Sequence, residues 1–216
     1  MTPKEISIII PTLNEEKTIS QCLETVVNIP GIEIIVSGGG STVEIAGQHS
    51  DVKVVSSLAG RSIQMNNGAA CAGGEILLFL HADCILSRED ILKIRKIFDS
   101  GKFVGGAFQI RLLSDKFTYR WLEMGINFRS KAFKLPYGDQ GLFVKRSIFE
   151  KLGGFREMPV CEDLDFVYRL RRKYGEIAIL NGRISSSVRT WKNRGIFRTS
   201  FRNQLLLYSY MIRQKV

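Results

Sequence analysis

A short apolar run at residues 76–80 constrains the fold of this chain more than any other feature. It reads Ile-Leu-Leu-Phe-Leu, and a run this short that is apolar on both faces is typical of a central strand in a parallel sheet covered by helices on each side. His81 and Asp83 follow it, at the carboxyl end where open α/β sheets bind their ligands. Residues two positions apart in extended backbone point the same way. This pair could therefore hold a divalent cation or a sugar hydroxyl; alternatively, Asp83 only caps the next segment.

Strand-like and helix-like segments alternate along the rest of the chain. Short β-branched or apolar runs predict strands at residues 7–11, 33–37, 52–56 and 76–80, and later at 104–112, 142–145 and 177–180. Asn14 is expected to cap the helix after the first strand, and Ser87 with Asp90 resembles a capping box that opens another helix. The alternation predicts a single α/β domain over residues 1–216, with a mostly parallel central sheet flanked by helices.

Two apolar stripes predict helices in the second half of the chain. Phe117, Trp121, Met124 and Phe128 recur at helical spacing, and we expect this stripe to pack into the core. An amphipathic helix is also predicted at the C-terminus; it either docks on the domain, which we favour because the sheet needs covering, or lies on anionic lipid. Its apolar face comprises Phe197, Phe201, Leu205, Tyr208 and Ile212, and its basic flank comprises Arg194, Arg198 and Arg202.

The net charge of +10 is distributed unevenly along the chain. Residues 1–110 carry 9 Lys and Arg against 12 Asp and Glu, whereas residues 111–216 carry 22 against 9. This asymmetry predicts an anionic partner for the second half, of which phosphate, nucleic acid and an acidic membrane surface are candidates.

The lack of a recognisable targeting signal and the spacing of the cysteines predict a cytoplasmic protein. No apolar run approaches the roughly 18 residues of a membrane span, and the first residues do not form a signal peptide. The four cysteines lie far apart, which favours reduced thiols over disulfides or a zinc site.

Common nucleotide and nucleophile motifs are incomplete. Gly38, Gly39 and Gly40 follow a predicted strand, but Val43 stands where a dinucleotide fingerprint needs its third glycine. The sequence contains no Walker A motif, and neither histidine lies in a nucleophile elbow. Glu162 and Asp163 open a predicted helix over residues 162–174; they either interact with the helix dipole or include a general base.

Taken together, the order and spacing of several segments resemble family 2 glycosyltransferases, which have the GT-A fold. The resemblance covers about residues 5–175 and is carried by residues 7–19, 60–70, 74–83, 137–146, 153–155 and 162–163. Residues 74–83 are similar to the segment that leads to the family's Asp-x-Asp motif. In particular, they resemble a small bacterial subgroup in which His-Ala-Asp replaces it.

The resemblance implies an inverting, metal-assisted hexosyltransferase-type enzyme that moves a sugar from a nucleoside diphosphate sugar to a hydroxyl acceptor, either lipid-linked or small. Residues 1–110 would form the nucleotide-binding half and residues 111–216 the basic acceptor half. Asp83 would bind Mg²⁺ or Mn²⁺, with His81 on the metal or ribose, and Asp163, next to Glu162, would be the general base. The donor and acceptor would contact Pro11, Asn14, Glu15, Gly38, Gly39, Arg61, Asn66, Asp139 and Gln140. No nucleic-acid partner is expected, and the basic tail suggests work at the inner membrane face.

The chain departs from the family pattern at two positions. Gly38 and Val43 stand where the family usually has aspartates, and losing a buried carboxylate–base hydrogen bond could cost roughly 1.5–3 kcal/mol of donor affinity. An altered donor or weakened activity is therefore one expectation. The alternative from another class is a non-catalytic nucleotide- or sugar-binding protein on the same fold. Nucleotidyl transfer is a third interpretation, but its usual glycine-rich loop with an arginine is missing.

Overall fold

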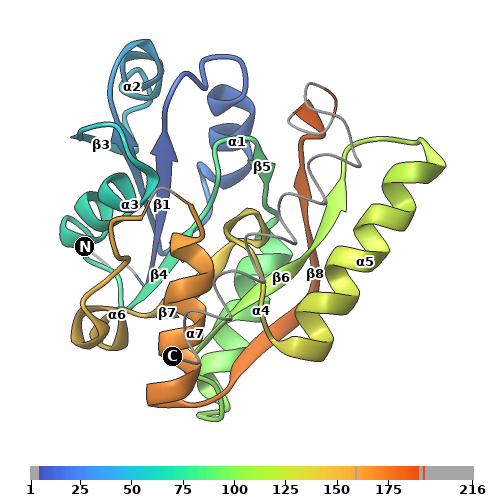
Figure 1. The fold of residues 1–216 in the computed structure, drawn as a ribbon. Helices are drawn as coiled ribbons and strands as arrows, with labels where there is room; N and C mark the ends of the chain where they lie inside the picture. Colours follow the sequence, from blue (N-terminus) through green and yellow to red (C-terminus); the bar gives the residue numbers. More distant parts are fainter. Residues whose placement is uncertain (1–4, 159, 190–191, 193–216) are drawn as a thin grey trace.

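The computed structural model describes residues 5–158, 160–189 and 192, and these form one α/β domain around a single sheet (Figure 1). Eight strands of the described residues pair in the order β3-β2-β1-β4-β7-β6-β8-β5. Their bounds are β1 Ile6–Thr12, β2 Ile32–Gly38, β3 Val52–Ser56, β4 Ile76–Phe79, β5 Cys84–Ile85, β6 Gly105–Leu112, β7 Leu142–Lys145 and β8 Ile177–Ser186.

The sheet is mostly parallel, as the alternation of elements predicts. β3, β2, β1 and β4 pair in parallel, and so do β6 and β8. β7 is antiparallel to both β4 and β6, and β5 is antiparallel to β8. Because β7 runs the other way, its first residue, Leu142, pairs with Phe79 at the end of β4. The loop before β7 therefore lies at the same sheet edge as the loop after β4.

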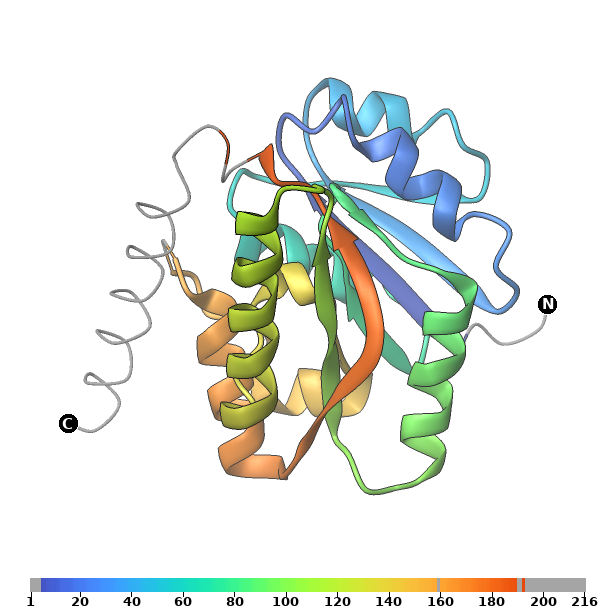
Figure 2. The ribbon, with the colours of Figure 1, turned by 90° about the vertical axis from the view of Figure 1, so that its right-hand side faces the viewer.

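Helices cover both faces of the sheet (Figures 1 and 2). They are α1 Ile19–Val26, α2 Ser41–Ala46, α3 Arg61–Ala70, α4 Arg88–Asp99, α5 Phe117–Phe133, α6 Arg146–Leu152 and α7 Glu162–Tyr174, with a 3-10 helix, η1, at Gly138–Gln140. Ile8 and Ile10 of β1 belong to a core cluster with residues of α1 and α4, whereas Ile9 belongs to one with residues of α3 and α7. Burial on both faces explains the run of three isoleucines, Ile8–Ile10, in this strand.

The ends of two helices test the capping predictions. Ser87 and Asp90 form a capping box at the start of α4, so this prediction is confirmed. The Asn14 prediction is wrong, because α1 begins at Ile19 with Thr18 at the N-cap position. Asn14 instead adopts a left-handed backbone conformation, with φ at 56°, which asparagine tolerates better than most residues because its short polar side chain bonds locally.

The prediction that the stripe on α5 packs into the core is also wrong. Phe117, Trp121, Met124 and Phe128 are 60–72% exposed. α5 packs instead through Tyr119 and Ile126, which cluster with three apolar residues of β6 and of the segment after β8, namely Ile110, Leu112 and Val188.

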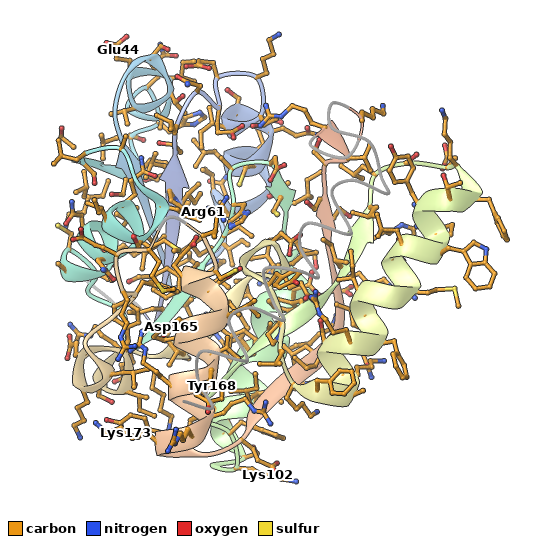
Figure 3. The ribbon with its side chains drawn as sticks, viewed as in Figure 1. Glu44, Arg61, Lys102, Asp165, Tyr168 and Lys173 are labelled. Atoms are coloured by element: carbon orange, nitrogen blue, oxygen red, sulfur yellow. The ribbon has the colours of Figure 1, made fainter. Side chains whose placement is uncertain are left out.

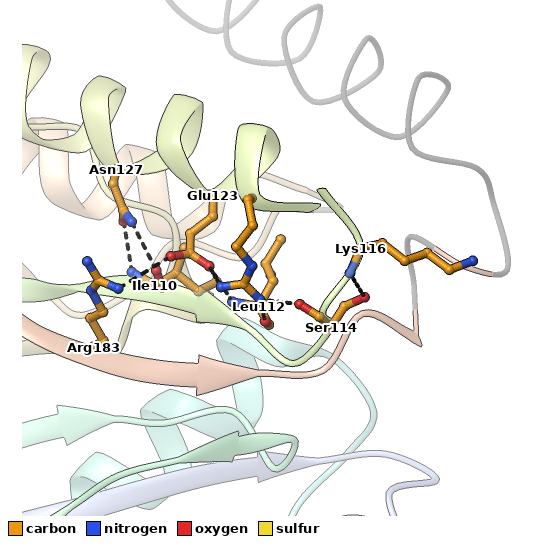
Figure 4. A network of polar contacts seen from close by, with 8 residues as sticks. Ile110, Leu112, Ser114, Lys116, Glu123, Asn127 and Arg183 are labelled. Carbon is orange, nitrogen blue, oxygen red and sulfur yellow. Dashed lines mark hydrogen bonds and ion pairs between the residues drawn. The ribbon is translucent and has the colours of Figure 1, made fainter. Parts of the chain in front are cut away.

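The physical reason is an incomplete strand edge. β7 pairs with β6 only at Gly105 and Gly106, so the rest of that edge needs other partners. Asn127 of α5 bonds both backbone groups of Ile110, each at 2.9 Å, and Glu123 accepts from the Leu112 N–H at 3.1 Å (Figure 4). The polar face of α5 therefore serves as the missing neighbour of β6, and the apolar stripe faces outward.

The predicted C-terminal helix lies outside the described residues. Among those that are described, no helix has the length and apolarity that crossing a membrane requires.

Candidate active site

Four segments of the chain bring acidic side chains to the carboxyl edge of the sheet. Asp83 lies in the loop between β4 and β5, and Asp139 lies in η1, just before β7. Glu162 and Asp163 lie in the first turn of α7, and Glu15 follows β1. The reversed direction of β7 is what brings Asp139 to this edge.

Gly138 lies between His81, from the first half of the chain, and Asp163, from the second half. Its N–H donates to Asp163 Oδ2 at 2.5 Å. A Cβ built on Gly138 would lie 3.1 Å from His81 Nε2 and 3.2 Å from Asp163 Oδ2. His81 and Asp163 therefore flank the same glycine, and a side chain at this position would push against both of them.

The negative charges of Asp83 and Asp163 both affect the pKa of the Asp139 carboxyl. Burial raises its pKa to about 6; Arg129 opposes this rise, while the negative charges of Asp163 and Asp83 add to it. Burial also raises the pKa of Asp83, with a further contribution from Glu15. Asp83, Asp139 and Asp163 thus form one electrostatic cluster.

His81 is held in its neutral form. Burial lowers its pKa to about 3, and the neighbouring Arg61 charge acts in the same direction. Its Nε2 atom is buried with no hydrogen-bond partner among the described residues, and the same holds for Asp139 Oδ1. A neutral imidazole can accept a hydrogen bond or coordinate a metal.

The side chains of Asp83 and His81 could hold a divalent cation whose remaining ligands come from a phosphate group. In the described part of the chain, no three His, Cys, Asp or Glu residues are grouped as a metal site. Mg²⁺ is commonly bound by one or two carboxylates together with substrate phosphates. Asp83, with the unpartnered nitrogen of His81, provides this kind of partial site.

Arg61, the first residue of α3, supplies positive charge to the cluster. Its guanidinium pairs with Glu162 at 3.2 Å, beside the start of α7 (Figure 3). Burial raises the pKa of Glu162, Asp163 adds to this rise and Arg61 opposes it. The Arg61 side chain is 53% exposed, so it can also reach a ligand.

The loops after β1 and β2 form the other side of the site. Pro11 is buried within β1, whereas Asn14 is exposed beyond it. The Glu15 N–H donates to Thr42 Oγ1 at 3.0 Å, which ties the loop after β1 to the start of α2. The Glu15 carboxylate also pairs with Arg189 at 2.5 Å.

Gly38 has no space for a side chain. A Cβ at this position would lie 2.3 Å from both the backbone oxygen and Oγ1 of Thr12, whereas one at Gly39 would only touch Ser57 O at 3.7 Å. The structure around residue 38 therefore fits glycine and not the aspartate of the family pattern, because Thr12 would have to move to make space for an aspartate side chain.

Two residues that the resemblance places at the ligand make hydrogen bonds to other parts of the protein. The Asn66 amide bonds the N–H and C=O of Phe155, at 2.9 and 2.8 Å. The Gln140 side chain accepts from Ser130 at 2.7 Å and donates to Phe108 O at 2.9 Å. In this structure both side chains position loops of the site, and their contact with a ligand stays a prediction.

The sequence analysis missed Arg129, Tyr137 and Arg189. The Arg129 guanidinium lies 3.5 Å from the centre of the Tyr137 ring, and its Nε is buried without a partner among the described residues. Arg129 faces the site because the polar side of α5 faces inward. The sequence pattern that could have revealed Arg129 is the set of polar residues on the side of α5 opposite its aromatic stripe.

A family profile and several known proteins match most of this chain. The profile of Glycosyl transferase family 2 matches residues 7–204. A beta-monoglucosyldiacylglycerol synthase of Nostoc is 22% identical over 222 residues, which cover 88% of this chain and 47% of the relative. This chain spans about half the length of the curated relatives it matches.

Two solved structures share the fold. Staphylococcus aureus TarS 1–349 in complex with UDP superposes with a TM-score of 0.70 and 16% identity, over 85% of this chain and 60% of TarS 1–349. The mannosyltransferase PcManGT of Pyrobaculum calidifontis, in complex with GDP-Man and Mn²⁺, gives a TM-score of 0.64 and 20% identity, over 85% of this chain and 57% of PcManGT. The expected GT-A architecture is therefore confirmed.

Proposed function

The chain belongs to glycosyl transferase family 2, and from this premise we propose that it transfers a sugar from a nucleoside diphosphate sugar to a hydroxyl acceptor with inversion at the anomeric carbon. The observation that carries the proposal is that His81 and Asp163 flank Gly138, the neighbour of Asp139, at the sheet edge where the Asp83 loop also lies. The UDP complex of TarS and the GDP-Man complex of PcManGT support a nucleotide-sugar donor. The name of the Nostoc relative supports a lipid among the candidate acceptors.

Asp163 is the proposed general base. Its two carboxylate oxygens accept from the N–H groups of Gly138 and Leu164, at 2.5 and 2.8 Å, which fixes the orientation of the carboxylate. Asp163 removes the proton of the acceptor hydroxyl while that oxygen bonds to the anomeric carbon. The bond from this carbon to the diphosphate breaks, and its electron pair leaves on the diphosphate.

Positive charge near the leaving group completes the proposal. A divalent cation held by Asp83, with His81 as a second ligand, would supply charge that stabilises the leaving nucleoside diphosphate. Arg61 is free to exchange its pairing with Glu162 for one with the diphosphate, because its side chain is half exposed. Asp139 and Gln140 would then lie beside the sugar.

A screen of nucleotide sugars tests this proposal against the non-catalytic alternative. We expect the wild-type protein to release nucleoside diphosphate from at least one donor, in a reaction that requires Mn²⁺ or Mg²⁺. The donors should include uridine and guanosine diphosphate sugars, since Gly38 replaces the aspartate of the family pattern. Donor binding without release for every nucleotide sugar, with and without candidate acceptors, would support a binding protein instead.

A further inference from the structure

The outer face of α5 presents four large apolar side chains that no described residue covers. Phe117, Trp121, Met124 and Phe128, which we call the α5 stripe, are 72, 60, 61 and 69% exposed. The rings of Phe117 and Trp121 contact each other edge to face at 5.9 Å. Single exposed apolar residues are ordinary, whereas a contiguous patch of this kind marks an interaction surface.

The stripe is held outward by the opposite side of the helix. Asn127 and Glu123 complete the hydrogen bonding of the β6 edge, and Arg183 approaches Glu123 to 3.8 Å (Figure 4). Rolling α5 to bury the stripe would leave these backbone groups and the Glu123 carboxylate without partners, and this cost opposes the rotation. The α5 stripe is therefore a fixed surface at the margin of the domain (Figures 1 and 2).

The charges around the α5 stripe select its partner. Lys116 precedes Phe117 at the start of the helix and Lys131 follows Phe128 by three positions, and both lysines are exposed. One exposed acid, Asp115, lies before Lys116. The sole acid within α5, Glu123, is buried and paired with Arg120 at 2.6 Å. Aromatic side chains with flanking Lys and Arg are typical of helices that lie in the interface of anionic membranes. We propose that the α5 stripe binds the surface of a bilayer that contains anionic lipids.

Two other occupants fit less well. Residues 193–216 contain an apolar pattern, but they carry five Lys and Arg and no acid. Like charges therefore oppose their docking beside Lys116 and Lys131. A second copy of α5 meets the same repulsion. An anionic lipid surface has the opposite charge to both the lysines beside the α5 stripe and residues 193–216. This inference does not depend on the proposed reaction, since the stripe lies on a different element from the acidic cluster.

Tryptophan fluorescence tests the contact directly, because Trp121 and Trp191 are the two tryptophans of the chain. In Trp191→Phe, Trp121 is the only reporter. We expect its emission to shift to shorter wavelength, and to be quenched by brominated acyl chains, when vesicles of phosphatidylcholine and phosphatidylglycerol are added. Phosphatidylcholine alone should have little effect, and raising the salt concentration should reverse the shift. Trp121→Phe, which retains Trp191, reports on the tail separately.

Variants of the stripe provide a second, quantitative test. Phe117→Ser combined with Phe128→Ser should weaken partitioning into the anionic vesicles by about tenfold or more, since each exposed ring contributes apolar area. Leu58→Ser is the matched control, because Leu58 is 78% exposed and lies outside α5. Circular dichroism and thermal melting confirm that each variant is folded.

Three results would overturn the inference. The first is an unchanged Trp121 spectrum in the presence of anionic vesicles. The second is unchanged partitioning of the double variant. The third is that Trp121 resists aqueous quenchers in the absence of vesicles, which would mean that the tail, or a second copy seen by sedimentation, already covers the stripe.

Discussion

Asp163→Asn should lower the rate of sugar transfer by about 10²–10⁴-fold, the usual contribution of a positioned general base. The amide keeps the shape of the carboxylate and can still accept from one of the two N–H groups that bind it, Gly138 or Leu164, but it cannot take the acceptor proton. Nucleotide-sugar binding should stay near the wild-type value, because Asp83 and Arg61 are unchanged. Transfer rates and calorimetric titrations of the same protein sample measure the two effects separately.

Asp139→Asn is the informative control for this assignment. Asp139 is another carboxyl of the cluster, and burial raises its pKa to about 6, so it is a rival candidate for the base. If Asp163→Asn retains full activity while Asp139→Asn loses it, the base is Asp139. If neither change affects the rate, the acidic cluster is not the catalytic site.

Asp165→Ala should destabilise the protein by about 3–5 kcal/mol, the usual cost of removing one partner from a buried ion pair. Asp165, which is labelled in Figure 3, is 1% exposed. It pairs with Arg169 at 2.6 Å and with Arg156 at 3.3 Å. Arg169 also donates to backbone oxygens of Leu152 and Gly154, so the pair fastens α7 to the loop after α6. Urea unfolding, followed by circular dichroism, measures the loss.

The matched control is Arg156→Ala. The Arg156 side chain is 62% exposed, and removing an exposed partner typically costs about 0.2–1 kcal/mol. A similar loss for both variants would mean that the buried position of Asp165 is not what makes it important. We therefore expect different effects from changing the two aspartates of this helical turn. Asp163→Asn should lower turnover, whereas Asp165→Ala should lower the stability of the fold.

The parts of the fold that depend on local pattern could be predicted well. The strand at Val52–Ser56 and the helix at Glu162–Tyr174 have the predicted bounds. In these segments, period, β-branching and first-turn acids all favour the same structure. The segment after Pro11 was less predictable, because the left-handed Asn14 lies in a loop whose length only the fold determines.

Features that depend on distant partners could not be predicted from local pattern. The inward polar face of α5 exists because β7 leaves part of the β6 edge unpaired, and no segment of the chain reveals this by itself. The Asn66 side chain bonds backbone 89 positions away, so its local sequence does not indicate this structural role. The expectation that Asp83 and Asp163 share one site came from the resemblance to a family, since the two residues lie on elements that are far apart in the chain.

The central claim is that Asp83 and Asp163 perform different tasks in one site. Calorimetric titration of a nucleoside diphosphate sugar into the wild-type protein and into Asp83→Asn, each with and without Mn²⁺, tests it most directly. We predict that Mn²⁺ strengthens binding to the wild-type protein and that Asp83→Asn removes this gain, lowering the affinity by about tenfold or more. Equal binding by both proteins, or binding that Mn²⁺ does not alter, would contradict the claim.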